Sequence, residues 1–354
     1  LFLFLTFVQG GQTLLWQVAK SDIEKSLVIN SLGRKWELTF TTLVLFGGAL
    51  FAAFPKFYAT SFGGAYWVWI LILFTFIIQA VSYEFRKKPS NLLGENVYEL
   101  FLFINGSVGI LLIGAAVGTF FTGSNFTLNQ FNQVSWTHPL MGLEAAFSLF
   151  NLSLGLFLVF NSRVIGSMYL LNNIDVSAVP DLEQRLRKAC LTNLVCALPF
   201  LLYVLVSLLL MKGFSFDDSG VVTIVSGKYL ENLLAMPIAL GLLLAGLVLV
   251  VWGVISTSFL GGYRGIWFGG LGTVLVGLAV FFTAGFNNTP FYPSKADLQS
   301  SLSIYNASSS HYTLTAMSYV ALVIPFVLAY IVYVWKLMDS KKIGHDDIND
   351  SKAY

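Results

Sequence analysis

Long apolar segments alternate with short polar ones along this chain, and the alternation predicts helices that cross a membrane. Nine apolar runs can be distinguished, at residues 1–15, 37–54, 64–84, 97–122, 140–171, 188–211, 230–260, 264–286 and 312–337. A helix needs about 20 apolar residues to cross the hydrocarbon core of a bilayer, and most of the runs reach that length. We therefore expect an all-α, polytopic membrane protein in which residues 1–354 form a single integral membrane domain.

The two ends of the chain depart from this pattern. The first run is short and no initiator Met precedes it, so we expect a first helix whose N-terminal part is missing, and not a signal peptide. The last residues, 338–354, are rich in Lys, Asp and Ser and follow the final run directly. We expect them to form a tail outside the membrane.

Composition supports the membrane assignment. Hydrophobic residues make up 56% of the chain and charged residues 11%, and the mean hydropathy is +0.75. A soluble domain of this length could not keep a wettable surface with so few polar side chains. The net charge is only +2, and the basic residues lie at the ends of apolar runs, so the charge does not indicate binding to nucleic acid.

The positions of Lys and Arg predict how the chain is oriented. Fifteen of the 20 basic residues fall in segments on one side of the predicted membrane and four on the other, while Arg163 lies inside a run. Because loops rich in Lys and Arg face the cytoplasm, we expect the C-terminus, with its tail at 338–354, to be cytoplasmic and the N-terminus to be outside. The segments 124–139, 213–228 and 287–311 would then lie on the outer face.

The side chains that could bind a redox cofactor are few and badly placed. Haem buried among helices needs axial His, Met or Cys ligands that face one another. His138 and His311 lie at the outer ends of predicted helices, and His345 lies in the tail. Cys190 and Cys196 are six residues apart, which places them about 240° apart around a helix. We therefore expect this chain to bind no haem or metal of its own.

Carboxylates inside apolar runs indicate function, because an ionised acid in a bilayer costs several kcal/mol unless it has a partner, a water path or a proton. Glu37, Glu84 and Glu99 lie at predicted cytoplasmic ends of runs, and Glu144 lies near the outer end of the run 140–171. The first three are candidates for a proton path from the cytoplasm. The alternative is that they lie at interface depth and pair with basic neighbours, namely Arg34, Lys35, Arg86 or Lys87.

Two separated blocks of the sequence resemble subunit II of the cytochrome bd quinol oxidases. The first block extends from Ile23 to Arg86 and contains Gly47-Gly48-Ala49-Leu50-Phe51-Ala52-Ala53-Phe54-Pro55, and the second extends from Pro293 to Ser310. The resemblance implies two four-helix bundles with a ninth helix outside them. It also implies a haem-free subunit of a quinol:oxygen oxidoreductase, with the b-type and d-type haems and the quinol-oxidising loop in subunit I.

The chain is a divergent member by this comparison. Residues 36–40 read Trp-Glu-Leu-Thr-Phe where the family usually has Trp-Asp-Gly-Asn, and the family's acid in the first helix is absent from Phe7-Val8-Gln9-Gly10-Gly11-Gln12. In relatives, the acid after the Trp is associated with a proton path that reaches subunit I. The resemblance therefore adds a proton-carrying role to the purely structural one for Glu37, which follows Trp36, and the sequence leaves both roles open.

Small residues predict where the partner binds. Gly47, Gly48 and Ala52 let another helix approach closely, and with Trp36 they are our candidates for the contact with subunit I. In this family helices two, three and nine take part in that contact. The resemblance is also compatible with a structural quinone, bound lipids and a small accessory subunit.

A secondary transporter or permease is the alternative, since such proteins also combine many helices with intramembrane acids. Transporters usually have paired, Gly- or Pro-interrupted helices around a site at the middle of the membrane. Here Pro199, Pro237 and Pro325 are scattered without such pairing. The oxidase subunit is therefore the preferred interpretation.

Overall fold

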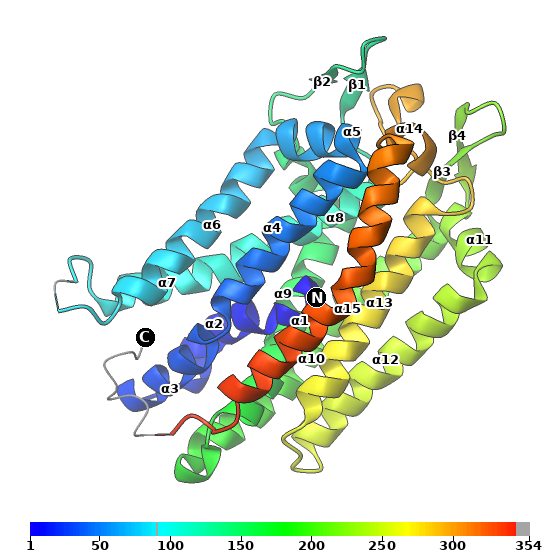
Figure 1. Ribbon diagram of the computed structural model, residues 1–354. Helices are drawn as coiled ribbons and strands as arrows, with labels where there is room; N and C mark the ends of the chain where they lie inside the picture. Colours follow the sequence, from blue (N-terminus) through cyan, green and yellow to red (C-terminus); the bar gives the residue numbers. More distant parts are fainter. Residues whose placement is uncertain (90, 345–354) are drawn as a thin grey trace.

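The computed structural model describes residues 1–89 and 91–344, and these fold almost entirely into helices (Figure 1). Within them, eight helical segments are long and apolar enough to cross a membrane. They are Asp22–Ala53, Tyr66–Phe85, Glu95–Thr122, Leu149–Asn173, Pro180–Leu210, Pro237–Ser258, Gly265–Gly285 and His311–Met338. The expectation of an all-α, polytopic membrane protein is confirmed.

The N-terminal helix is short but deeply buried. It consists of α1 (Phe2–Leu5) and α2 (Phe7–Val18), and every residue from Leu5 to Leu15 is buried. Gly10 allows α2 to meet α9 (Leu149–Asn173), because a Cβ on Gly10 would lie 1.8 Å from the carbonyl oxygen of Ser162. The most enclosed segment of the fold is therefore the one whose sequence run is shortest.

The remaining helices form two groups and one outlier. The first group surrounds α2 and contains α3 (Asp22–Gly33), α4 (Trp36–Ala53), α6 (Tyr66–Phe85), α7 (Glu95–Ile104) and α8 (Ile110–Thr122). The second contains α9, α10 (Pro180–Leu210), α12 (Pro237–Ser258) and α13 (Gly265–Gly285), and α8 packs on α9 to join the two. The outlier α15 (His311–Met338) packs mainly along α4 and is exposed over most of its length. These contacts agree with two bundles and a peripheral helix.

Short elements connect the helices on the side opposite to the end of α15 at Met338 (Figure 1). Two antiparallel hairpins lie there, β1 (Phe126–Leu128) with β2 (Val134–Trp136) and β3 (Lys212–Phe216) with β4 (Val222–Ser226). The same side carries α5 (Pro55–Tyr58), the π-helix η1 (Ala59–Gly63), the 3-10 helices η3 (Leu143–Phe147) and η5 (Leu298–Ser300), α11 (Lys228–Ala235) and α14 (Ile304–Ala307). The short 3-10 helix η4 (Val176–Ala178) joins α9 to α10.

Three expected runs differ from the helices in detail. The run 140–171 begins as helix only at Leu149, so Glu144 lies on η3 before the span and not inside it. The run 230–260 divides into α11 and α12 at Met236, because Pro237 lacks an N–H and starts a new helix. The run 97–122 continues through a π-helical turn, η2 (Asn105–Gly109), which interrupts regular α-helix between α7 and α8.

Candidate functional site

Glu99 is the buried carboxylate of the first bundle. Its side chain is 1% exposed, and its Oε1 lies 2.9 Å from Nη2 of Arg86. Its Oε2 lies 3.0 Å from Nζ of Lys25 and accepts a hydrogen bond of 3.0 Å from the indole N–H of Trp16. Two cations and one neutral donor therefore compensate the cost of burying this acid.

The charges around Glu99 are balanced. Arg86 also contacts the exposed Glu95, whose Oε2 lies 2.6 Å from the same Nη2. Two acids, Glu95 and Glu99, thus face two cations, Arg86 and Lys25. Arg86 itself is buried, and its Nε and Nη1 have no hydrogen-bond partner among the described residues. The N–H groups of these two nitrogens indicate a place for water inside the protein.

A column of polar side chains continues from this charged cluster into the bundle. Tyr83 lies one turn before Arg86 on α6, and its hydroxyl accepts a hydrogen bond of 3.0 Å from Nε2 of Gln12. Farther along, Asn105 donates to the hydroxyl of Thr75 at 3.5 Å. Gln79 lies one turn from both Thr75 and Tyr83, so the helical repeat puts it on the same inner face of α6. We call Gln9, Gln12, Thr75, Gln79, Tyr83 and Asn105 the polar column.

Six of the eight side-chain amide atoms in the polar column lack a partner among the described residues. Both polar side-chain atoms of Gln9 and of Gln79, Oε1 of Gln12 and Oδ1 of Asn105 are buried without a hydrogen bond to any described residue. An unpaired buried amide is costly, and native proteins satisfy such groups with ordered water. The chemistry of the column therefore fits a file of internal water molecules that begins at the Glu99 cluster.

Glu37 and Glu84 do not join Glu99. Both are exposed on the isolated chain, and neither forms an ion pair or a side-chain hydrogen bond with a described residue. The basic residues near them have other partners: Lys35 contacts Asp339 at 2.9 Å, and Arg86 contacts Glu95 and Glu99. Of the three carboxylates that sequence analysis selected, the structure therefore surrounds only Glu99 with compensating charges.

A stacked aromatic pair connects the polar column to α4. The rings of Trp36 and Tyr83 lie 5.7 Å apart and nearly parallel, at 10°. The indole N–H of Trp36 is buried and has no partner among the described residues. Trp36 is thus an internal residue, while the next residue, Glu37, lies on the outside of α4.

The remaining candidates for the contact with a partner are also divided between buried and exposed positions. Gly48 is exposed, and a Cβ built on it would meet nothing within 4 Å. Gly47 is buried, and its Cβ would contact the ring of Phe62 at 3.4 Å, while Ala52 is half-buried. Gly48 therefore leaves open space for a second protein, whereas Gly47 serves packing within this chain.

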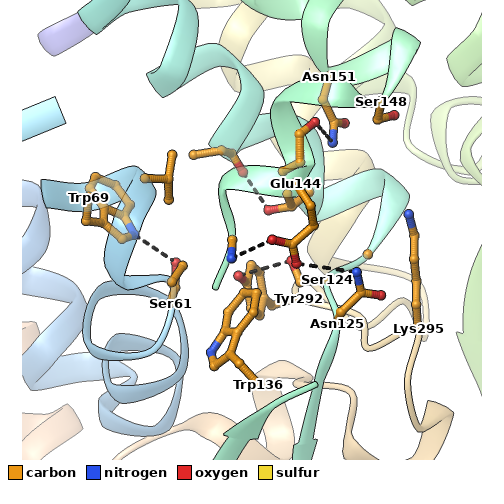
Figure 2. A pocket seen from close by; sticks show the side chains of 17 residues that line it. Ser61, Trp69, Ser124, Asn125, Trp136, Glu144, Ser148, Asn151, Tyr292 and Lys295 are labelled. Carbon is orange, nitrogen blue, oxygen red and sulfur yellow. Dashed lines mark hydrogen bonds between the residues drawn. The ribbon is translucent and has the colours of Figure 1, made fainter. Parts of the chain in front are cut away.

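A second polar region lies at the opposite end of the bundle (Figure 2). It is a cavity of about 90 Å³ between η1, η3, the end of α8 and the segment around Tyr292. Glu144 points into it and accepts hydrogen bonds from the backbone N–H of Gly142 at 2.8 Å and from Nδ2 of Asn125 at 3.3 Å. The hydroxyl of Ser124 donates to that of Tyr292 at 3.2 Å. We call this the outer cavity.

Burial changes two titrating groups of the outer cavity. It raises the pKa of the Tyr292 phenol, which therefore stays neutral. It lowers the pKa of the Lys295 ammonium, although the nearby carboxylate of Glu144 acts in the opposite direction. Glu144 and Lys295 give the outer cavity one negative and one positive side chain. The cavity therefore favours neither anions nor cations, and water is the better occupant.

The described residues contain no group of three or more His, Cys, Asp or Glu side chains that could hold a metal ion. Nδ1 of His138 lies 3.6 Å from Glu144 at the outer cavity, and His311 begins α15. Cys190 and Cys196 are both free thiols. His345 lies outside the described residues.

Sequence analysis weighed carboxylates and passed over the amides of the polar column. A signal was present: Gln9, Gln12 and Trp16 recur at helical spacing in one apolar run, as do Thr75, Gln79 and Tyr83 in another. Polar side chains that share one face of a membrane helix indicate an internal polar surface. That surface, and not the separate acids, is the most distinctive feature of the first bundle.

Comparison with known proteins gives a consistent result over the whole chain. The family model of the cytochrome bd terminal oxidase subunit II matches residues 1–338. A probable cytochrome oxidase subunit 2 of Haemophilus influenzae is 28% identical over 356 residues, which cover 97% of this chain and 90% of that protein. The cytochrome bd-I ubiquinol oxidase subunit 2 of Escherichia coli K12 is 28% identical over 362 residues, covering 97% and 91%. The cytochrome bd ubiquinol oxidase subunit 2 of Bacillus subtilis is 30% identical, over 29% of this chain and 30% of that protein.

Proposed function

Because the chain belongs to the cytochrome bd terminal oxidase subunit II family, we propose that it brings protons from the cytoplasm to a haem-bearing subunit I and scaffolds that partner. The reaction of the complex is quinol oxidation coupled to the reduction of oxygen to water. In this proposal the b-type and d-type haems belong to subunit I. The positions of His138 and His311, at the outer cavity and at the start of α15, support that division.

The observation that carries the proposal is the polar column with Glu99 at its entrance. Reduction of oxygen to water consumes protons, which must cross part of the membrane to reach a buried haem. Water held by Gln9, Gln12, Gln79 and Asn105 would let protons move between neighbouring molecules. The Tyr83 hydroxyl, which accepts a hydrogen bond from Gln12, can pass a proton on through its own O–H.

The charge balance at the entrance suits this task. An entrance with uncompensated cations would repel protons, and one with uncompensated acids would trap them. The two acids and two cations around Glu99 avoid both extremes while keeping the entrance polar enough to hold water. Lys87, which donates to Ser26 at 2.8 Å, adds a further basic residue to this end of the bundle.

The proposed orientation puts the Glu99 cluster on the cytoplasmic side. Basic residues gather at this end of the helices, including Lys25, Arg86, Lys87 and Arg185. The positive-inside rule then gives a cytoplasmic C-terminus and an inner, multi-pass location in a bacterial membrane. Protons would enter the column from the cytoplasmic side, and quinol would be oxidised by subunit I.

Glu37 is proposed as the residue through which protons leave toward subunit I. On α4, Glu37, Val44, Gly48 and Phe51 lie on the exposed side. Residues 11 positions apart fall within about 20° of each other around a helix, so Glu37 and Gly48 share one face. If subunit I docks on this face, it covers Glu37, whose neighbour Trp36 stacks on Tyr83 of the polar column.

Neither the family match nor the helix breaks of the described residues favour the transporter alternative. A transporter site would lie between helices broken at the middle of the membrane. The break at Met236 separates the short helix α11 from the span α12 and so lies at the end of that span. The π-helical turn at Asn105–Gly109 contains Asn105 of the polar column. A structural quinone, lipids and an accessory subunit stay compatible with the proposal and are not required by it.

The test uses the intact complex, purified through this chain. The double variant Gln9→Leu with Gln79→Leu should keep the haem spectrum and lower oxygen consumption per haem with excess quinol. Asn193→Leu is the matched control, because Asn193 is also a buried amide, and among the described residues its side chain donates to the carbonyl of Ala189 in its own helix, at 2.7 Å. Full turnover in the double variant would contradict the proton route. A complex without haem or without a second large subunit would contradict the oxidase assignment.

A further inference from the structure

An apolar layer separates the polar column from the outer cavity. Ile72, Phe76, Ile110 and Ile113 belong to one cluster of buried side chains, each at most 7% exposed. The same cluster includes Ala65 and Val68, which line the outer cavity. On the other side, Thr75 lies beside Phe76 and marks the inner end of the layer. We infer that this layer, here called the seal, closes the polar column against the outer face.

The dimensions of the seal follow from the helical rise. Val68 at the cavity and Thr75 at the column are seven residues apart on α6, a distance of about 10 Å along the helix. The hydroxyl of Thr75 donates to the backbone carbonyl of Ile72 at 2.7 Å, so it offers no donor toward the seal. The side chains between the two polar regions are therefore hydrocarbon over a length of several water diameters.

Such a layer is an effective barrier to protons. Narrow hydrophobic constrictions exclude water, and a proton without a chain of water would have to cross as a bare charge. Transfer of an isolated charge into an apolar interior costs far more than any single hydrogen bond returns. Packing is tight here as well, because a Cβ on Gly109 would lie 2.6 Å from the hydroxyl of Thr75.

The seal determines the direction in which protons move through the subunit. This inference rests on the proposed function, in which protons enter the column at Glu99. With the outer end closed, a proton in the column can only return or leave sideways toward the partner. The subunit would then feed protons to oxygen reduction without short-circuiting the proton gradient that the same enzyme complex helps to build.

The test measures passive proton flow through the complex in liposomes. The purified complex is reconstituted without quinol, a potassium diffusion potential is applied with valinomycin, and the internal pH is followed with a trapped dye. Ile72→Asn should raise the proton flow above that of the unmodified complex by about tenfold, which corresponds to a barrier lower by about 1.4 kcal/mol. Ile72→Val, which keeps the layer apolar, should leave the flow unchanged.

Further variants separate the seal from the proton route. Ile113→Thr is a smaller polar change in the same layer and replaces Ile72→Asn if that variant loses haem or subunit I. Adding Gln9→Leu and Gln79→Leu should abolish the extra flow, because it interrupts the column below the opened layer. Extra flow that persists in this combination would support the seal and contradict the proposed route. Normal flow in a fully assembled Ile72→Asn or Ile113→Thr complex would overturn the seal, whatever the turnover of the column variants.

Discussion

The polar column and the outer cavity lie in one helix bundle but satisfy their polar groups in opposite ways. In the outer cavity Glu144, Ser124 and Tyr292 have partners in the protein, most of them in loops and short helices. In the column, the amides of Gln9 and Gln79 have none among the described residues. A region that is satisfied by its own fold can be static, whereas one that needs water has room for protons to move.

The difference also concerns charge. Around Glu99, cations and acids are in direct contact, within 3.0 Å. In the outer cavity, Lys295 forms no ion pair with a described acid, and Glu144 is held by neutral donors. We therefore expect substitutions at the column to change assembly or turnover strongly, and substitutions at the cavity to have small effects.

The largest effect is expected from removing the charge of Glu99 altogether. Glu99→Leu leaves Arg86 as a buried, less compensated cation, and breaking a buried ion pair typically costs about 3–5 kcal/mol. The complex should assemble poorly, measured as the yield of subunit I haem per cell. The double variant Glu99→Leu with Arg86→Leu should recover part of that yield, because it removes the buried cation, while Lys25 and Glu95 are partly exposed to solvent. Normal assembly of the single variant would contradict the compensating role of Glu99.

A bulky residue at Gly48 should come next, because it tests where the partner binds. Gly48→Trp puts a bulky side chain at a position where a Cβ meets nothing within 4 Å in this chain, so this subunit should still insert in the membrane. The amount of subunit I that copurifies with it should fall strongly. The matched control is Gly241→Trp on α12, where a Cβ also meets nothing within 4 Å. Equal loss in both variants would mean that the face carrying Gly48 is not special.

Glu37→Gln should have an intermediate effect, confined to turnover. If Glu37 passes protons to subunit I, oxygen consumption per haem should fall, assembly should stay normal, and Glu37→Asp should be milder. Glu84→Gln is the control, since Glu84 is an exposed acid at the same end of the bundle. Full turnover per haem in Glu37→Gln between about pH 6 and 8.5 would leave Glu37 as an anchor at the interface.

The smallest effect is expected at Lys295. Burial holds its pKa below the ordinary value of 10.5, so the folded state binds fewer protons than the unfolded state as the pH approaches that value. Stability should therefore rise slightly with pH in that alkaline window, and Lys295→Met should remove the rise. The change should stay below about 1 kcal/mol because the side chain is partly in water. Thermal unfolding of the two proteins between neutral and alkaline pH measures it, and a fall in stability with pH would give the wrong sign.

The apolar runs were sufficient to predict a polytopic helical membrane protein, because they depend only on local composition, whereas the two bundles and the peripheral helix were expected only from the family resemblance. The sequence also put Arg86 among four basic residues that could pair with Glu99, and the two residues are 13 positions apart, at the ends of neighbouring helices. It could not show that Lys25 and Trp16, more than 70 positions away, complete the same cluster. Contacts of this kind depend on how helices pack, which no local pattern encodes.

The sequence also did not predict where the span after Glu144 begins or that Glu37 is exposed. Apolar residues on η3 extended the predicted run, although the backbone there is a 3-10 helix and the span begins at Leu149. Glu37 is exposed because of the way α4 is rotated about its own axis. Apolar residues are spread around that helix, so its sequence does not predict the rotation. The polar column, by contrast, could have been found from Gln9, Gln12 and Gln79 by asking which polar residues share a face.

Proton uptake by the complex during a single reaction with oxygen tests the central claim most directly. The fully reduced complex is mixed with oxygen, haem oxidation is followed by absorbance, and proton uptake from solution is followed with a pH dye. In the Gln9→Leu, Gln79→Leu double variant we predict that oxygen binds at the normal rate and that proton uptake, with the haem steps that depend on it, is slower. Proton uptake at the unmodified rate in that variant, with its haems intact, would contradict the account.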